Sequence, residues 1–307
     1  MMKSPEAPTY KVGKNKSVAP TGAMSPDDAR AAAMQFLGGL AVEVSSGTVN
    51  LPCFPDVVLR IRKTLSDPKN TPEKTVTVVS AEPQLAARLL QTANSAAFNP
   101  SGKPLTDLRT AITRLGHQMV QSAAMSFAVQ HMKNEASLRS IAGRMNELWK
   151  ESISVAMICQ TVARRTKVTP DEAFLTGLMH GIGRLYIMVR AVEKGEEFGM
   201  SAAFRELIDG WHASIGKAVL ENWGFPEELC EAVEVQSDTD LRNKETNLSD
   251  VLVASIVLGQ ALRMPAPRVV KTEGVRSFET IGLSEKDNVD ILTHTEYQLG
   301  CLQEALG

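Results

Sequence analysis

Apolar and polar residues alternate with a helical period along most of the chain. The clearest case is the segment from Leu138 to Val162, in which apolar and small residues recur at alternating spacings of three and four. That spacing places them on one face of a helix, so we predict a single long amphipathic helix here. The residues of this stripe are Leu138, Ile141, Met145, Leu148, Ser152, Val155, Cys159 and Val162.

Signals that begin and end helices punctuate the rest of the chain. Residues 25–28 offer a capping serine, a first-turn proline and two acids that face the helix dipole, and residues 71–73 and 169–172 repeat this device. Glycine–proline breaks at 102–104 and 224–226 separate further helices. The chain is therefore predicted to consist of short and medium helices joined by tight connections.

The predicted fold class is all-α, with about a dozen helices. The period-two alternation typical of strands is confined to short ambiguous runs such as Thr75 to Val79. A last helix, about Ser284 to Ala305, follows a polar connection. We expect a flexible tail at 1–25, an N-terminal helix at 26–47, a central domain at 48–263 and a helical extension at 264–307.

Composition narrows the classes of function. Apolar residues make up 43% and charged residues 22% of the 307 residues, as in ordinary globular proteins, and the net charge is −2. Such a balance provides no global basic field, so we expect neither DNA nor an anionic membrane as a partner. The longest uncharged apolar run, Val251 to Leu262, is too short to cross a bilayer, and the first 20 residues lack the apolar core of a signal peptide. Four widely separated cysteines suggest neither structural zinc nor a disulfide framework, and the expected location is the cytoplasm.

The segment Gly-Leu-Met-His-Gly-Ile-Gly at 177–183 carries the most informative chemistry. A histidine followed by an aspartate in such a setting is the metal-binding centre of many phosphohydrolases, because a hard divalent ion needs an anionic oxygen beside the imidazole nitrogen. Here Gly181 follows His180, and glycine supplies no ligand. The expected ligand set is therefore incomplete.

Two interpretations of the neighbouring polar residues remain open. His180 and Arg184 are four residues apart, so we expect them on one helical face that could hold a phosphate or carboxylate, although an arginine beside a structural histidine is the simpler interpretation. Glu151, His180 and His212 could in principle form a site of two histidines and one carboxylate. Spacing alone does not decide between these possibilities.

A series of short motifs runs from about residue 48 to residue 263. They are Leu51-Pro52-Cys53-Phe54-Pro55-Asp56-Val57, Glu82-Pro83-Gln84-Leu85, Ala93-Asn94-Ser95-Ala96, Ala111-Ile112 with Leu115-Gly116, Leu148-Trp149, Ala173-Phe174, Gly177-Leu178-Met179-His180, His212-x-x-Ile215-Gly216 and Trp223-Gly224-Phe225-Pro226. In order and spacing the series resembles the HDOD family, the bacterial HD-related output domain, although Glu82 stands where the family usually has Asp. The landmarks interpreted as structural are Pro52, Pro55, Asn94, Ser95, Gly116, Gly177, Gly183 and Trp223.

The resemblance implies an HD-like multi-helix bundle with an N-terminal helical subdomain. The family looks like a catalytically lapsed relative of the His-Asp phosphohydrolases. Glu151-Ser152 stands where a metal-binding relative would have His-Ser, Val235-Gln236 replaces the later paired histidines, and Ser255 falls near the position of the final Asp. Two remaining histidines, His180 and His212, do not make a catalytic metal centre.

By this resemblance the chain is expected to be a non-catalytic bacterial signal-transduction module without a cofactor. Its partners would be signalling proteins supplied in trans. One alternative is an effector that binds a phosphate-bearing signalling nucleotide through His180, Arg184 and Arg88. Another is a residual metal-dependent phosphohydrolase. The candidate vestigial pocket consists of Glu151, His180, Gly181, Arg184 and His212.

Overall fold

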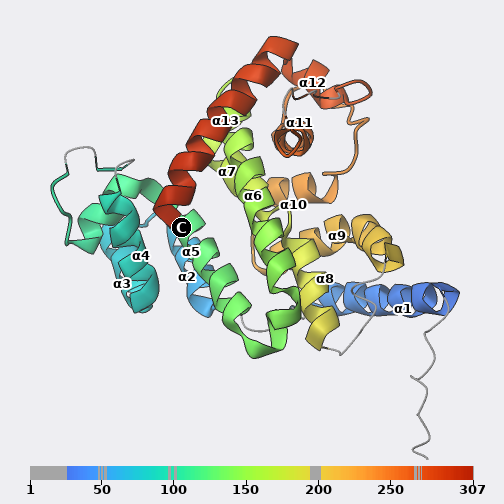
Figure 1. The fold of residues 1–307 in the computed structure, drawn as a ribbon, viewed down its shortest axis with the longest axis horizontal. Helices are drawn as coiled ribbons and strands as arrows, with labels where there is room; N and C mark the ends of the chain where they lie inside the picture. Colours follow the sequence, from blue (N-terminus) through green and yellow to red (C-terminus); the bar gives the residue numbers. More distant parts are fainter. Residues whose placement is uncertain are drawn as a thin grey trace, which may run out of the picture.

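The computed structural model describes residues 26–306 apart from 48, 50, 52–53, 96–97, 100–101, 194–201, 266–267, 269 and 271. The predicted tail at 1–25 and the landmark Pro52 lie outside the described residues. Within the described part, every regular element is a helix and no β-strand occurs (Figure 1). The all-α prediction is confirmed, and no described helix is both long and apolar enough to cross a membrane.

The N-terminal helix α1 (Pro26–Ser45) packs along α9 (Ala202–Asn222). Its buried face includes Phe36, whose ring lies 6.2 Å from that of Phe204 on α9. The side chain of Arg190 is 8% exposed and forms an ion pair with Glu43 of α1 at 2.8 Å. The predicted helix at 26–47 is therefore an integral part of the core.

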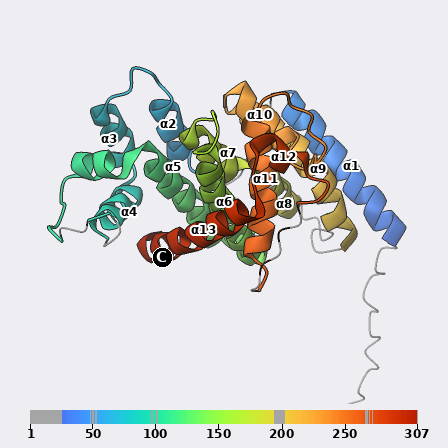
Figure 2. The same cartoon turned by 90° about the horizontal axis from the view of Figure 1, so that it is seen from above.

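Four helices form the N-terminal subdomain, of which α3 and α4 lie at the opposite end of the molecule from α1 in both views (Figures 1 and 2). They are α2 (Asp56–Leu65), α3 (Pro72–Ser80), α4 (Pro83–Asn94) and α5 (Leu108–Asn134). Thr71 caps α3 by accepting from the Lys74 backbone N–H, so the predicted start is correct. The ambiguous run Thr75 to Val79 lies within this helix.

The centre of the molecule consists of η1 (Ala136–Ile141, a 3-10 helix), α6 (Ala142–Ala163), α7 (Pro170–Met179), α8 (Ile182–Glu193), α9, α10 (Glu227–Glu234) and α11 (Leu248–Leu262). The prediction of one helix from Leu138 to Val162 is wrong, because Ile141 has φ −109° and ψ 2° and separates η1 from α6. The 3-10 period of three keeps Leu138 and Ile141 on the buried side, so the stripe continues across the break.

Two C-terminal helices, α12 (Arg276–Ile281) and α13 (Glu285–Leu306), complete the fold. Helix α13 packs against α6 and α11 and crosses the middle of the molecule (Figure 2). An ion pair between Arg165 and Asp287 fixes its first turn beside the end of α6. The last predicted helix is thus confirmed to within one residue at each end.

Candidate functional site

Two glycines set the helix packing around the candidate pocket. A β-carbon added at Gly177 of α7 would lie 2.6 Å from the Cα of Ala156 on α6, and one added at Gly183 of α8 would lie 1.9 Å from the carbonyl oxygen of His212 on α9. Real β-carbons do not approach backbone atoms this closely. Both family landmarks are therefore places where only glycine allows two helices to touch.

His180 lies at the junction of two helices. Helix α7 ends at Met179 and α8 begins at Ile182, so His180 and Arg184 belong to different elements. The expectation that they share one face of a single helix is wrong. The reason is the His180–Gly181 turn, after which the Gly181 carbonyl accepts from the Leu185 N–H and starts the new helix.

The imidazole of His180 is buried, with 1% of the residue exposed. Its Nδ1–H donates to the Gly177 carbonyl at 2.6 Å, while Nε2 is buried and has no hydrogen-bond partner among the described residues. Burial lowers the pKa of His180, and the charges of Arg184 and Arg263 act in the same direction, so the ring is neutral at pH 7. A neutral ring with a hydrogen on Nδ1 leaves a bare lone pair on Nε2.

Glu151 faces the same locus from α6. Its carboxylate forms an ion pair with the guanidinium of Arg263, the residue that follows α11, and the two groups are 2.8 Å apart. Burial acts to raise the pKa of the Glu151 carboxyl, but the hydrogen bond and charge of Arg263, with a smaller contribution from the charge of Arg184, hold it below its ordinary value. The carboxylate is thus ionised and already neutralised by a guanidinium.

His212 and Arg184 complete the group. The residue His212 is 1% exposed, its Nδ1 lies 3.2 Å from the Ile208 carbonyl and 3.0 Å from the Asp209 carbonyl, and burial lowers its pKa to about 4. Arg184 forms an ion pair with Asp209 at 3.2 Å. The guanidinium of Arg184 is thus already paired with a carboxylate of the chain. This favours an arginine beside a structural histidine over an arginine that binds an anion.

The remaining positions of a His-Asp ligand set carry other contacts. A β-carbon at Gly181 would lie 2.8 Å from Leu148 Cδ1 and 3.1 Å from Ser152 Oγ. The Gln236 amide donates to the Val233 carbonyl at 2.8 Å and to the His180 carbonyl at 3.2 Å. In α11, Ser255 lies against the Cys159 thiol, whose pKa burial raises to about 12.

These residues do not fit a catalytic divalent ion. Around His180 there is one bare imidazole nitrogen and one carboxylate paired with Arg263, and the described residues include no group of three His, Cys, Asp or Glu able to hold a metal. A catalytic zinc centre has three protein ligands. Arg184 nevertheless connects the candidate residues, because its charge acts on Glu151 and His180 and also on His212.

Sequence reasoning missed two members of the locus, Arg263 and Asp209. Asp209 stands three residues before His212 on α9, and this carboxylate at helical spacing is a signal that could have been used. Arg263 follows an apolar helix and meets Glu151 only through the tertiary fold, so no local pattern marks it.

The landmark residues of the N-terminal subdomain have structural contacts. The Asn94 amide donates to the carbonyls of Leu90 (2.9 Å) and Leu105 (2.8 Å), and its Oδ1 accepts from the Leu105 N–H at 2.7 Å. The Ser95 hydroxyl donates to the Thr92 carbonyl at 2.7 Å. Asn94 therefore ties the segment before α5 to the end of α4, as expected for a structural Asn-Ser pair.

Gly116, Pro55 and Arg88 also have structural contacts or positions in the N-terminal subdomain. Gly116 has φ 74° and makes the kink inside α5, a backbone conformation that side chains with a β-carbon rarely adopt. Pro55 is the residue that precedes α2. Arg88 of α4 donates to Gln130 of α5 at 2.5 Å, so it joins two helices of this subdomain.

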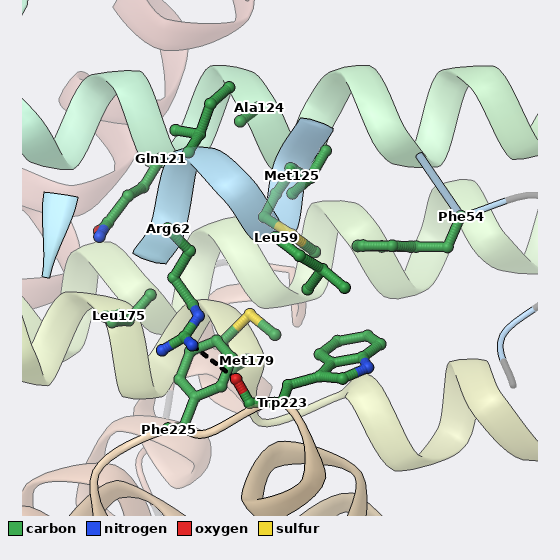
Figure 3. A pocket seen from close by; sticks show the side chains of 12 residues that line it. Phe54, Leu59, Arg62, Gln121, Ala124, Met125, Leu175, Met179, Trp223 and Phe225 are labelled. Carbon is green, nitrogen blue, oxygen red and sulfur yellow. Dashed lines mark hydrogen bonds between the residues drawn. The ribbon is translucent and has the colours of Figure 1, made fainter. Parts of the chain in front are cut away.

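Trp223 lies in a narrow apolar slot between α2, α5, α7 and the turn from α9 to α10 (Figure 3). It stacks on Phe54 with ring centroids 5.1 Å apart. Arg62 of α2 donates to the Trp223 carbonyl at 2.5 Å and the Gly224 carbonyl at 3.3 Å, and its guanidinium lies 4.1 Å from the centre of the Phe225 ring. These contacts fasten the N-terminal subdomain to the turn, and the slot of about 20 Å³ has room for little more than a water molecule.

Comparison with known proteins places these features in a family. The HDOD domain matches residues 51–239, more than half of the chain. A Shewanella amazonensis SB2B protein, provisionally named a metal-dependent phosphohydrolase, superimposes with a TM-score of 0.65 and 22% identity over 90% of this chain and 100% of its own. A Geobacter sulfurreducens HDOD domain protein of unknown function gives 0.57 and 23%, over 89% and 97%.

Two further similarities extend the comparison. A protein from Marinobacter aquaeolei VT8, provisionally named a signal transduction protein, gives a TM-score of 0.64 with 19% identity, covering 91% of this chain and 66% of its own. An uncharacterized protein of Treponema pallidum (strain Nichols) is 22% identical over 205 residues, which are 63% of this chain and 39% of the relative. The chain thus spans well under half of that relative's length, and the structural matches at these identities establish the fold.

Proposed function

The chain belongs to the HDOD family, and on that premise we propose that it is a non-catalytic bacterial signalling module that acts in the cytoplasm through contacts with partner proteins. The similarity to a protein named for signal transduction is consistent with this role. In such a module, the residues Glu151, His180 and His212 serve the packing of the bundle and hold no metal.

The ion pair between Glu151 and Arg263 is the observation that carries the proposal. Glu151 stands at the position where a metal-binding relative would have its first ligand. Its carboxylate lies 2.8 Å from the guanidinium of Arg263. A divalent ion that approached Glu151 would be repelled by Arg263 and Arg184, whose charges both act on that carboxyl. The loss of the ligand at Gly181 is therefore accompanied by positive charge at the same locus.

The proposal competes with a residual metal-dependent phosphohydrolase that uses Glu151, His180 and His212. If the chain were such an enzyme, protein purified without chelators would retain stoichiometric iron, manganese or zinc. It would also hydrolyse bis(p-nitrophenyl) phosphate when manganese is added. We expect substoichiometric metal by elemental analysis and a rate equal to that of the double variant His180→Gln/His212→Gln.

A nucleotide effector is the other competing function. Arg184 already forms an ion pair with Asp209 at 3.2 Å. A phosphate that bound to Arg184 would therefore have to displace the Asp209 carboxylate. We expect no rise in melting temperature with cyclic dinucleotides or guanosine polyphosphates, since saturating binding would stabilise the fold by a few kcal/mol. Stabilisation that Arg184→Gln abolishes would favour the effector instead.

A further inference from the structure

The charge of this chain is distributed unevenly. Residues 54–134, the N-terminal subdomain, contain ten Lys and Arg against five Asp and Glu, a net charge of +5 in a chain whose net charge is −2. The rest of the chain is therefore clearly acidic. A partner that approaches this subdomain meets a local positive potential that the overall composition conceals.

An open groove of about 900 Å³ lies where this subdomain meets the turn from α9 to α10. Its lining includes the cations Arg62, Lys63 and Lys74 and a single acid, Asp67. Lys74 lies 3.6 Å from Asp67, whereas Lys63 has no carboxylate within ion-pair distance in the described part of the chain. The groove consequently carries an excess of positive charge.

The floor of the groove is partly apolar. Trp223 and Val78 line it, and Trp223 together with Arg62 also lines the neighbouring slot (Figure 3). Arg62 donates to the Trp223 and Gly224 carbonyls and has no ion pair with a carboxylate among the residues that the structure describes, and burial lowers the pKa of its guanidinium. An incoming carboxylate would offer this half-buried cation a charge partner that the described residues do not supply.

We propose that this groove binds an acidic, extended peptide segment of a partner protein, with one apolar side chain against Trp223 and Val78 and carboxylates toward Lys63, Lys74 and Arg62. Charge complementarity favours such a segment. This inference rests on the proposed signalling function and specifies the kind of partner through which it acts.

A nucleotide and a nucleic acid match the groove less well. Phosphate recognition needs several donors that converge on one point, but the hydroxyls of Thr64 and Thr77 donate to the Arg60 and Glu73 carbonyls of their own helices. A nucleic acid is a long polyanion, and the acidic remainder of the chain would repel it beyond the groove.

Fluorescence anisotropy with a labelled synthetic peptide of sequence EDELFEDE tests the proposal on the full chain. We expect saturable binding that weakens when NaCl is raised from about 50 to about 500 mM, because salt screens exposed charges. The double variant Lys63→Glu/Lys74→Glu should bind at least about tenfold more weakly, since two exposed charge contacts are reversed. The matched control Lys244→Glu/Lys286→Glu, which reverses two exposed lysines outside the groove lining, should bind like the wild type.

Further probes separate the outcomes. A peptide in which Ser-Gly replaces Leu-Phe should bind more weakly than the original, because the apolar contact is lost. Absence of binding by the original peptide at the lower salt, or equal weakening in both double variants, would overturn the proposal. So would tighter binding of GTP or of a single-stranded oligonucleotide than of the peptide. Metal content and phosphohydrolase activity are measured separately, so failure here leaves the non-catalytic function standing.

Discussion

Gly183→Ala is expected to be among the most damaging small substitutions in the chain. The added β-carbon would lie 1.9 Å from the His212 carbonyl oxygen and 2.8 Å from the Gly216 nitrogen. Ordinary contact begins near 3.4 Å, so α8 and α9 would have to separate by about 1.5 Å. Both obstacles are backbone atoms of α9, and no side-chain rotation relieves them.

The energetic cost follows from the geometry. Overpacking of a well-packed interior typically costs 1–3 kcal/mol, and a clash that only helix separation relieves belongs at or above the upper end, so we expect about 3 kcal/mol. For a chain of this size that corresponds to a fall in melting temperature of roughly 6–12 °C. The separation would also disturb His212, whose carbonyl is the contact atom.

Urea unfolding followed by far-UV circular dichroism measures this change. Gly210→Ala on the same helix α9 is the matched control, because a β-carbon there has no neighbour within 4 Å. That variant should gain roughly 0.5–1 kcal/mol from the lower flexibility of its unfolded chain. If Gly183→Ala unfolded at the same urea concentration as wild type, the close contact between α8 and α9 would be refuted.

Three other substitutions probe the fold and the candidate site. Arg190→Gln should destabilise the protein by roughly 1.5–3 kcal/mol, because it removes a charged hydrogen-bond partner from Glu43, whose side chain is 24% exposed, and Glu43→Gln in the same chain should restore part of the loss by urea unfolding. Gly116→Ala should cost roughly 1–3 kcal/mol through backbone strain alone, since its φ is 74° and its β-carbon would meet no neighbour. Burial lowers the pKa of His212 from 6.5 to about 4, so between pH 6.5 and pH 4 this histidine is protonated in the unfolded chain and neutral in the folded chain. This contribution to stability is complete above pH 6.5 and falls by roughly 3 kcal/mol as the pH drops toward 4, and His212→Gln should flatten that dependence in urea titrations at several pH values.

Much of the fold was predictable because its signals are local. Proline in the first turn beside acidic residues begins α1 at Pro26, α3 at Pro72 and α7 at Pro170, as expected. The break at Ile141 was not predictable, since a 3-10 turn and an α-helix place residues three apart on nearly the same face. Likewise, no spacing rule revealed that α7 ends at Met179 and separates His180 from Arg184.

The candidate site was predictable only through the family pattern. The motifs pointed to Glu151, His180 and His212, and the charge of Arg184 acts on all three, yet whether they bind a ligand stays a prediction. The ion pairs to Arg263 and Asp209 depend on packing between α6 and α11 and between α8 and α9, and the first of them has no signature in the sequence. Arg263 and Asp209 decide whether the site can bind a ligand, because they form ion pairs with Glu151 and Arg184, the charged groups that a metal ion or an anion would need.

Titration with Mn²⁺ monitored by electron paramagnetic resonance tests the central claim most directly. It should be carried out on the wild type and on Gly181→Asp, whose new side chain would start 2.8 Å from Leu148 Cδ1 and 3.1 Å from Ser152 Oγ on α6. We predict that the signal of free Mn²⁺ rises with each addition, without a stoichiometric bound fraction, in both proteins, because Arg263 neutralises Glu151 and the charges of Arg263 and Arg184 repel the ion. Binding of one Mn²⁺ per chain by the wild type, or by Gly181→Asp alone, would contradict the account.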